Sequence, residues 1–169
     1  MSPSQELLPT LETLARALRR RRERIATAES CTGGMIAAAC TDLPGSSEWF
    51  ERGFVTYSNE AKHELLGVDP RVLAREGAVS EAVARAMAEG ALAHAPVEWS
   101  VAVTGIAGPG GATPGKPVGT VWLAVSGRGM TTALMLRLDG DRASVRAQTV
   151  VHAVHALRRA IEASPEPHG

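Results

Sequence analysis

The chain has 169 residues, of which 44% are hydrophobic, a size and composition that suit one domain with a substantial core. Its 18 basic residues balance 18 acidic ones, so a net charge of +0 gives no general attraction to nucleic acid or an anionic membrane. Cys31 and Cys40 form neither a CxxC pair nor a disulfide framework. The first ten residues do not resemble a signal peptide, and no apolar run is long enough to span a membrane. We therefore expect a single cytoplasmic domain over 1–169.

Periodicity and capping residues predict eleven elements along the chain. In chain order these are a helix over 7–18 ending in the arginine run 19–22, a strand over 25–29, a helix over 32–43, a strand over 51–58, helices after Ser58, Asp69 and Ser80, a strand within 99–107, a hairpin of strands 120–126 and 131–138, and a helix over 141–163. The first helix falls within 1–24, and we expect the tail 164–169 to be disordered. This order predicts an α/β fold with a mixed, mostly parallel five-stranded sheet and helices on both faces.

Hydroxyl groups and glycines follow each predicted parallel strand. The first strand leads into Ser30, Thr32, Gly33 and Gly34, the second into Tyr57 and Lys62, and the third into Thr104, Gly105 and the loop that begins at Gly108. Ligands of open α/β sheets bind beyond the carboxyl ends of such strands. If the three strands are neighbours, these groups line one pocket.

A serine at this edge needs a base in order to act as a nucleophile. None of the five histidines follows a predicted strand, and Lys62 and Lys116 are the two lysines of the chain. A desolvated lysine can replace histidine, because burial disfavours its charged form. We therefore expect Ser30 and Lys62 to form a dyad that Tyr57 orients or relays. The amides of Thr32, Gly33 and Gly34 are candidates to hold an oxyanion or a phosphate.

Simpler interpretations exist for each of these residues. Ser30 or Thr32 could merely cap the following helix, Lys62 could be a solvated lysine, and Tyr57 could lie at the edge of the core. Cys31 is either a rival nucleophile or a small buried residue. His152 and His155 have the spacing of a metal pair, but the sequence offers no third ligand, so we predict no metal. The arginine run 19–22 is typical of a solvated helix end rather than a nucleic-acid surface.

Residues 110–116 match the GxxxxGK pattern of a phosphate-binding loop. Pro117, however, occupies the position where that motif needs a serine or threonine for Mg²⁺. The segment also leads into a predicted strand instead of a helix. We conclude that it is not a P-loop.

Four stretches together resemble a known family. They are "TAESCTGG", "GFVTYSNEAK" with "LLGV", "GAVSEAVA", and "AVTGIAGPGG…KPVGTVW" with the later "GDR…VR". In this order they are similar to the CinA C-terminal domain family, also known as the PncC-type nicotinamide mononucleotide amidohydrolases, over about 25–163. The resemblance implies a three-layer α/β/α fold. It also implies hydrolysis of the carboxamide of nicotinamide mononucleotide to nicotinate mononucleotide and ammonia, in pyridine nucleotide recycling.

The same resemblance implies roles for single residues. The family's serine, tyrosine and lysine match Ser30, Tyr57 and Lys62, which coincides with the dyad expected from the strand ends. Its threonine matches Thr104, and its arginine matches Arg142, a candidate phosphate ligand because of its fork geometry. The expected partner is thus a small nucleotide, without a metal or organic cofactor.

Two other functions remain open at this point. One is a silent nucleotide-binding module, which would share the glycine turns. The other is an interaction domain in competence or DNA damage, which the family's name suggests and for which the arginine run 19–22 would be the first surface to test. The sequence leaves the oligomeric state open, a homo-oligomer included.

Overall fold

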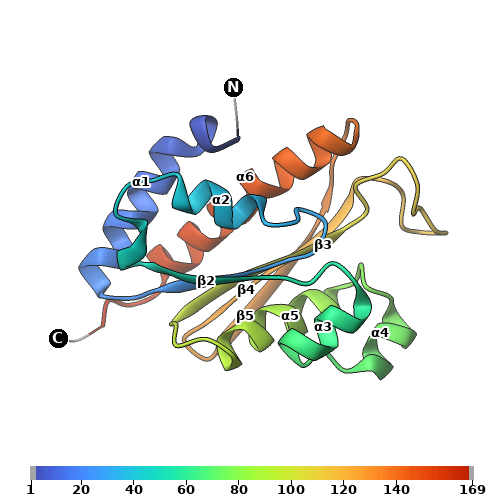
Figure 1. The fold of residues 1–169 in the computed structure, drawn as a ribbon, viewed down its shortest axis with the longest axis horizontal. Helices are drawn as coiled ribbons and strands as arrows, with labels where there is room; N and C mark the ends of the chain where they lie inside the picture. The colour runs from blue at the N-terminus through green and yellow to red at the C-terminus, as the bar shows by residue number, and fades with distance from the viewer. Residues whose placement is uncertain (1–2, 168–169) are drawn as a thin grey trace.

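The computed structural model describes residues 3–167. Its centre is a five-stranded sheet with the strand order β2-β1-β3-β4-β5 (Figure 1). The strands are β1 (Ile25–Glu29), β2 (Phe50–Val55), β3 (Trp99–Gly105), β4 (Thr120–Gly127) and β5 (Met130–Arg137). β1 pairs in parallel with β2 and β3, whereas β4 runs antiparallel to both β3 and β5. The predicted mixed sheet, with three parallel strands and a hairpin, is confirmed.

Helices cover both faces of this sheet, which gives three layers (Figure 1). One face carries α1 (Pro3–Arg21), α2 (Met35–Thr41) and α6 (Arg142–Ala163), and the other carries α3 (Asn59–Leu66), α4 (Pro70–Glu76) and α5 (Glu81–Ala93). A short 3-10 helix, Ser46–Glu48, precedes β2. The parallel strands therefore end at one common edge, where their following loops meet.

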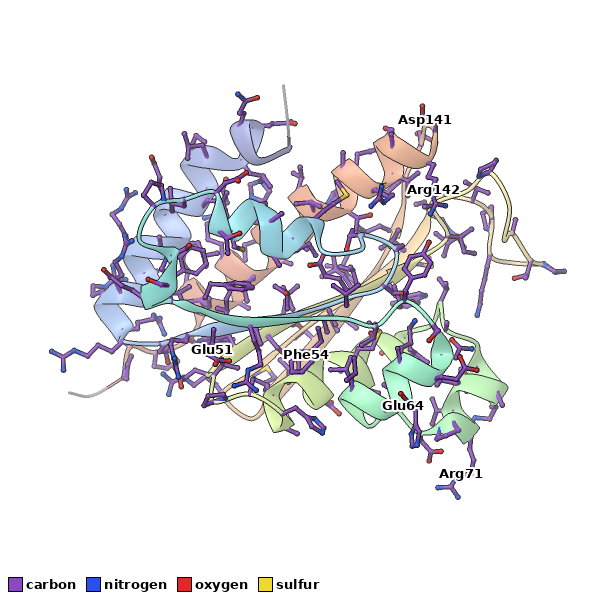
Figure 2. All side chains as sticks on the ribbon, in the orientation of Figure 1. Glu51, Phe54, Glu64, Arg71, Asp141 and Arg142 are labelled. Atoms are coloured by element: carbon purple, nitrogen blue, oxygen red, sulfur yellow. The ribbon has the colours of Figure 1, made fainter. Side chains whose placement is uncertain are left out.

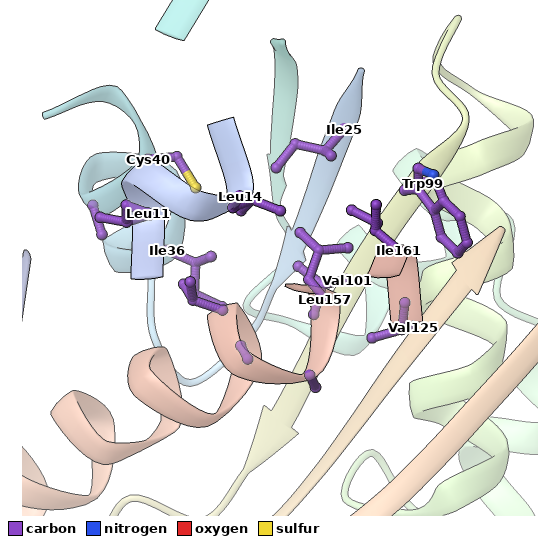
Figure 3. Packing of buried hydrophobic residues seen from close by; sticks show 14 of the residues in the cluster. Leu11, Leu14, Ile25, Ile36, Cys40, Trp99, Val101, Val125, Leu157 and Ile161 are labelled. Carbon is purple, nitrogen blue, oxygen red and sulfur yellow. The ribbon is translucent and has the colours of Figure 1, made fainter. Parts of the chain in front are cut away.

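The two faces of the sheet differ in side-chain size. Ile25, Val101 and Val125 belong to the core under α1 and α6, which Figure 3 shows together with Leu157 and Ile161. The facing core under α5 contains alanines from the strands, among them Ala26, Ala28, Ala102 and Ala124. Because side chains alternate along a strand, the same strands present large residues to one layer and small ones to the other. The small face lets α5 lie close to the sheet.

Side-chain caps begin three of the helices at the expected residues. Ser58, Asp69 and Ser80 accept hydrogen bonds from the backbone N–H groups of Ala61, Arg71 and Val83. The start of α2 was predicted wrongly. This helix begins at Met35 instead of residue 32, since Gly33 and Gly34 have φ angles of 58° and 107°. Residues 30–34 thus form a turn outside the helix.

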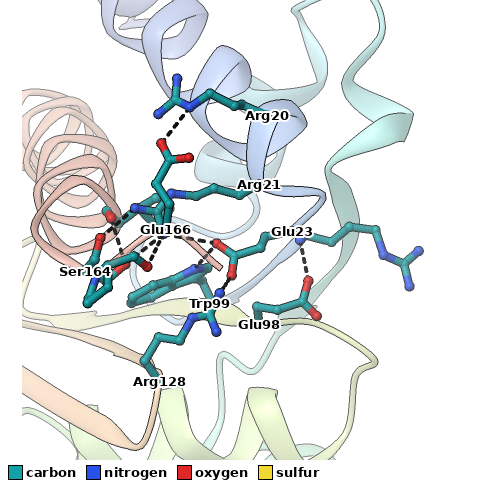
Figure 4. Close-up of polar contacts among 11 residues, drawn as sticks. Arg20, Arg21, Glu23, Glu98, Trp99, Arg128, Ser164 and Glu166 are labelled. Carbon is teal, nitrogen blue, oxygen red and sulfur yellow. Dashed lines mark hydrogen bonds and ion pairs between the residues drawn. The ribbon is translucent and has the colours of Figure 1, made fainter. Parts of the chain in front are cut away.

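Three arginines of the run 19–22 are paired within the molecule. Arg19 contacts Glu48. Arg20 contacts Glu166, and Arg21 contacts both Glu23 and Ser164 (Figure 4). Ser164 and Glu166 lie in the tail that we expected to be disordered, and in the structure they hold the end of α1. Residues 168 and 169 of that tail lie outside the described part of the chain. The arginine run is therefore used to anchor α1.

Candidate active site

Ser30 and Lys62 meet at the carboxyl edge of the parallel strands. Ser30 follows β1, and its backbone N–H donates to Val103 O of the neighbouring β3. Lys62 lies in the first turn of α3, which follows β2. Its Nζ atom is 2.9 Å from Ser30 Oγ. The pair that the sequence predicted from two strand ends is thus in direct contact.

The environment of the Lys62 amine shifts its protonation equilibrium toward the neutral form. The side chain is 1% exposed, and Nζ donates to Thr56 O at 2.9 Å and Tyr57 O at 3.2 Å. Burial lowers the pKa of Lys62, because the charged amine loses its hydration. A neutral amine has two N–H groups and one lone pair. With two carbonyl oxygens using the N–H groups, the lone pair is left to accept the Ser30 hydroxyl.

The side chain of Glu29 holds the turn at Ser30 in place through hydrogen bonds. This buried carboxylate accepts hydrogen bonds from Thr32 Oγ1 at 2.6 Å, Ile36 N at 2.8 Å and Ala37 N at 3.1 Å. Thr32 therefore donates to Glu29 rather than capping α2, whose cap residue Gly34 provides no side chain. Ser30 caps no helix either. Its hydroxyl contacts Lys62 instead. The interpretation of Ser30 or Thr32 as a helix cap is therefore wrong.

Cys31 is a poor rival nucleophile. Its side chain is buried, and burial raises the pKa of the thiol to about 11. The thiol is therefore protonated near neutral pH, and the thiolate is the nucleophilic form of cysteine. Cys31 therefore forms part of the wall of the site next to Ser30.

The amides that were expected to cradle an oxyanion are not equivalent. Gly33 N donates to Ser30 O at 3.0 Å, so this amide closes the turn. The hydrogen bonds of residues 3–167 include no backbone acceptor for the amides of Thr32 and Gly34. Of the three backbone amides expected to bind an oxyanion or a phosphate, only those of Thr32 and Gly34 have no backbone acceptor among the described residues.

Tyr57 and Arg142 meet at the mouth of the site. Tyr57 is 59% exposed, and its hydroxyl accepts a hydrogen bond from Arg142 Nη2 at 2.9 Å. The hydroxyl thus faces Arg142, while the backbone carbonyl of Tyr57 contacts Lys62. Figure 2 shows Arg142 at the start of α6, beside the loop that connects β3 and β4. Arg142 Nη1 donates to Gly108 O of that loop at 2.9 Å.

A cavity of about 260 Å³ opens beside the dyad. Ser30, Lys62, Tyr57, Thr104, Gly105, Gly108 and Arg142 line it with Ala78 and Ile106, among others. Thr104 Oγ1 donates to Ala78 O, so the hydroxyl also ties β3 to the loop before α5. A Cβ on Gly105 would lie 3.2 Å from Cys31 Sγ and closer still to Val121, which explains why glycine stands there. Gly33 and Gly34 shape the turn without lining the cavity.

Two contact residues were not singled out from the sequence. Glu29 read as the last residue of a strand, and Arg146 was one letter of the "GDR…VR" stretch. Arg146 donates to the carbonyl oxygens of Cys31 and Thr32, 115 and 114 residues away along the chain. The one signal in the sequence for Glu29 was its position: an acidic residue at the end of an apolar strand, directly before Ser30.

Of the remaining sequence features, only the glycines at the start of the 110–116 loop, Gly110 and Gly111, line the cavity beside the dyad. Residues 3–167 hold no group of three or more His, Cys, Asp or Glu residues placed to bind a metal ion, so His152 and His155 find no third ligand there. Residues 110–116 form a loop that leads into β4, with a single bridge between Thr113 and Lys116. No helix within the described chain has the length and apolarity to cross a bilayer.

The fold and the dyad together define a three-layer α/β/α protein with a serine–lysine pair at the carboxyl edge of its sheet. Residues 8–161 match the model of the CinA C-terminal domain, and the chain belongs to this family.

Known proteins of several lengths are similar to the chain. It is 49% identical to the protein named nicotinamide-nucleotide amidohydrolase PncC of Escherichia coli K12 over 153 residues, which cover 90% of this chain and 93% of that protein. It is 52% identical to the putative competence-damage inducible protein of Symbiobacterium thermophilum, covering 92% of this chain but 38% of that longer protein. The chain thus spans little more than a third of this second relative.

Solved structures agree with the fold. The competence damage-inducible protein A of Klebsiella pneumoniae superposes with a TM-score of 0.90 at 38% identity, covering 98% of this chain and 100% of that one. The competence/damage inducible protein of Agrobacterium tumefaciens superposes with a TM-score of 0.83 at 45% identity, covering 90% and 96%.

Proposed function

We propose that the chain is a nicotinamide-nucleotide amidase. It hydrolyses the carboxamide of nicotinamide mononucleotide to nicotinate mononucleotide and ammonia, within pyridine nucleotide recycling. The observation that carries this proposal is the buried Lys62 amine, 2.9 Å from Ser30 Oγ and held by two carbonyl oxygens. The substrate comes from the name of the Escherichia coli relative, which matches over nearly its whole length.

In the first step Ser30 attacks the carboxamide carbon. Lys62 Nζ takes the hydroxyl proton as the bond from Ser30 Oγ to carbon forms, which places negative charge on the former carbonyl oxygen. Backbone amides of the Ser30 turn stabilise this charge. The carbon–nitrogen bond then breaks, and the leaving NH₂ group takes the proton from Lys62 to depart as ammonia.

Water completes the reaction. Lys62, neutral again, accepts a proton from a water molecule that attacks the acyl-enzyme ester. The bond between carbon and Ser30 Oγ breaks, and the proton on Lys62 returns to Ser30. The product is nicotinate mononucleotide. The dyad accounts for both halves of this cycle with the protein's own groups.

Arg142 and Tyr57 are suited to hold the nucleotide. Arg142 lies between the 260 Å³ cavity and a neighbouring cavity of about 700 Å³, both of which it lines. A guanidinium at this border can pair with a phosphate, and the exposed ring of Tyr57 offers a face for the pyridine ring. We assign the phosphate to Arg142 and the carboxamide to the dyad end of the cavity, lined by Thr104, Gly105 and Gly108.

The deciding experiment is ammonia release from nicotinamide mononucleotide by the purified protein. We expect Ser30→Ala and Lys62→Met each to lose at least about 10³-fold in kcat, as removal of a catalytic nucleophile or base does elsewhere. Cys31→Ala is the matched control, since it changes the adjacent side chain and should keep the activity. Full ammonia release by Ser30→Ala would overturn the mechanism.

The competing functions make different forecasts. A silent nucleotide-binding module would bind the mononucleotide without turnover, and Lys62→Met would leave that function intact. A nucleic-acid partner at the arginine run has little support, because Arg19, Arg20 and Arg21 are paired with acidic residues of this chain. We also propose a cytoplasmic site of action, supported by the two free thiols, Cys31 and Cys40.

A further inference from the structure

Arg146 reaches from the second turn of α6 to the backbone that follows Ser30. Its Nε atom donates to Cys31 O at 3.1 Å, and its Nη2 atom donates to Thr32 O at 3.3 Å. A Cβ added to Gly33 would lie 3.5 Å from Nη2, so the guanidinium passes directly beside this glycine. One planar group therefore holds two consecutive peptide units.

Holding a carbonyl also fixes the amide of the same peptide plane. In a trans peptide the C=O and N–H groups point in opposite directions. Arg146 thus sets the direction of Thr32 N–H through Cys31 O, and that of Gly33 N–H through Thr32 O. Gly33 N–H closes the turn on Ser30 O, whereas Thr32 N–H has no backbone acceptor among residues 3–167. The fixed amide of Thr32 lies two residues after the nucleophile, in a fully buried residue, so the hold on the two carbonyl oxygens acts on the shape of the turn that follows Ser30.

We propose that Arg146 is a positioning residue of the amidase reaction. It locks the Cys31–Thr32 and Thr32–Gly33 peptide planes of the turn that follows Ser30, and so holds Ser30 Oγ before Lys62. Lysine would not replace Arg146. A guanidinium has several N–H donors in one plane and can bind both carbonyl oxygens, whereas the compact ammonium of lysine cannot reach both in this geometry. This inference rests on the proposed function of Ser30.

A different role for Arg146 has a different kinetic signature. Arg146 lines the 700 Å³ cavity together with Arg142, so it could instead bind the substrate phosphate. Loss of a phosphate ligand weakens binding and raises KM. Loss of a positioning group acts on an interaction formed in the transition state, and therefore lowers kcat at constant KM.

The test uses Arg146→Met and Arg146→Lys, with Arg159→Met as the control for an exposed arginine of the same helix. We expect Arg146→Met to lose about 10²-fold in kcat for nicotinamide mononucleotide, the size of loss that a small misplacement of a reacting group can cause, with KM unchanged. Added guanidinium ion, at a concentration that leaves the fold intact, should restore part of kcat. Arg146→Lys should fall between Arg146→Met and the wild type, and the control should match the wild type. A raised KM with normal kcat, or no change in either, overturns the proposal.

A second readout separates this inference from the choice of substrate. A fluorophosphonate probe reacts with the bare dyad: the bond from Ser30 Oγ to phosphorus forms, the bond from phosphorus to fluorine breaks, fluoride leaves, and Lys62 takes the proton. We expect Arg146→Met to slow this labelling and guanidinium to restore it. If the wild type is labelled but leaves nicotinamide mononucleotide intact, the proposed substrate is wrong while the positioning role is still judged by the labelling rates. Equal rates in both proteins overturn it.

Discussion

At the scale of single residues, the lysine environment decides the chemistry. Lys62 contacts three oxygen atoms, and two of them are carbonyls that can only accept hydrogen bonds. A protonated amine would satisfy all three oxygens but would lack hydration in this buried place. The neutral amine satisfies the two carbonyls and accepts the Ser30 proton. The same contacts therefore serve both the resting state and the protonated intermediate.

The pH dependence of kcat follows from this environment. Because burial lowers the pKa of Lys62 below its ordinary value of 10.5, the amine becomes neutral at a lower pH than a solvated lysine. Only the neutral amine accepts a proton, so kcat should fall as the pH drops through the pKa of Lys62. We expect a single ionisation in the pH profile of ammonia release, with its midpoint below 10.5. A midpoint at or above that value would contradict the assignment of Lys62 as the base.

At the scale of elements, the close packing of α5 against α3 places the lysine. Gly90 of α5 faces the end of α3, where a Cβ would lie 2.1 Å from Leu66 O, a backbone atom that cannot rotate away. Leu66 is one helical turn after Lys62. The distance of α3 from the sheet thus depends on Gly90, which does not line the cavity. This distance in turn sets how far the Lys62 side chain extends toward Ser30.

Gly90→Ala should be destabilising although alanine is the better helix former. Helix propensity favours alanine by about 1 kcal/mol, but an overpacked contact costs about 1–3 kcal/mol and here involves backbone. We expect a lower unfolding midpoint in urea and a reduced kcat, since α3 must shift. Glu89→Ala, at the neighbouring exposed position of α5, is the matched control and should change neither quantity. An unchanged kcat in Gly90→Ala would show that α3 adjusts without moving Lys62.

At the scale of the whole molecule, stability and chemistry lie at opposite ends of the parallel strands. Ser30 follows the end of β1, whereas Glu23 precedes its start. The buried carboxylate of Glu23 contacts Arg21 and Arg128 and accepts a hydrogen bond from Trp99 Nε1 at 3.1 Å (Figure 4). This cluster ties α1, the start of β3 and the hairpin turn together. Its own residues are not among those that line the cavity at the dyad.

Glu23→Ala should therefore reduce stability without reducing activity. Removing one partner of a buried ion pair costs about 3–5 kcal/mol, because the remaining charges lose their counter-ion. We expect a large drop in the free energy of unfolding, measured by urea titration, and a normal kcat at temperatures where the variant is folded. Glu48→Ala removes the exposed pair with Arg19 and should cost at most about 1 kcal/mol. A proportionate loss of kcat in folded Glu23→Ala would show that the two ends are coupled.

Much of the fold could be predicted because its signals are local. The caps Ser58, Asp69 and Ser80 begin helices where expected, since each accepts a backbone N–H three or fewer residues away. The start of α2 was missed because the positive φ angles of Gly33 and Gly34 cannot be read from residue type alone. Glycine permits such angles without requiring them.

The sequence by itself determined the order of strands and helices, and with it the edge of the sheet where Ser30, Tyr57 and Lys62 gather. Only the tertiary structure decided which atoms meet: the amine of Lys62 with Ser30 Oγ, the carbonyl rather than the hydroxyl of Tyr57 with Lys62, and Arg146 with the serine turn. The spacing of apolar residues along the chain indicates which face of a helix or strand is buried, and this spacing can be read from the sequence alone. The direction of a hydrogen bond depends on groups that folding brings together from distant positions, and no local pattern records it.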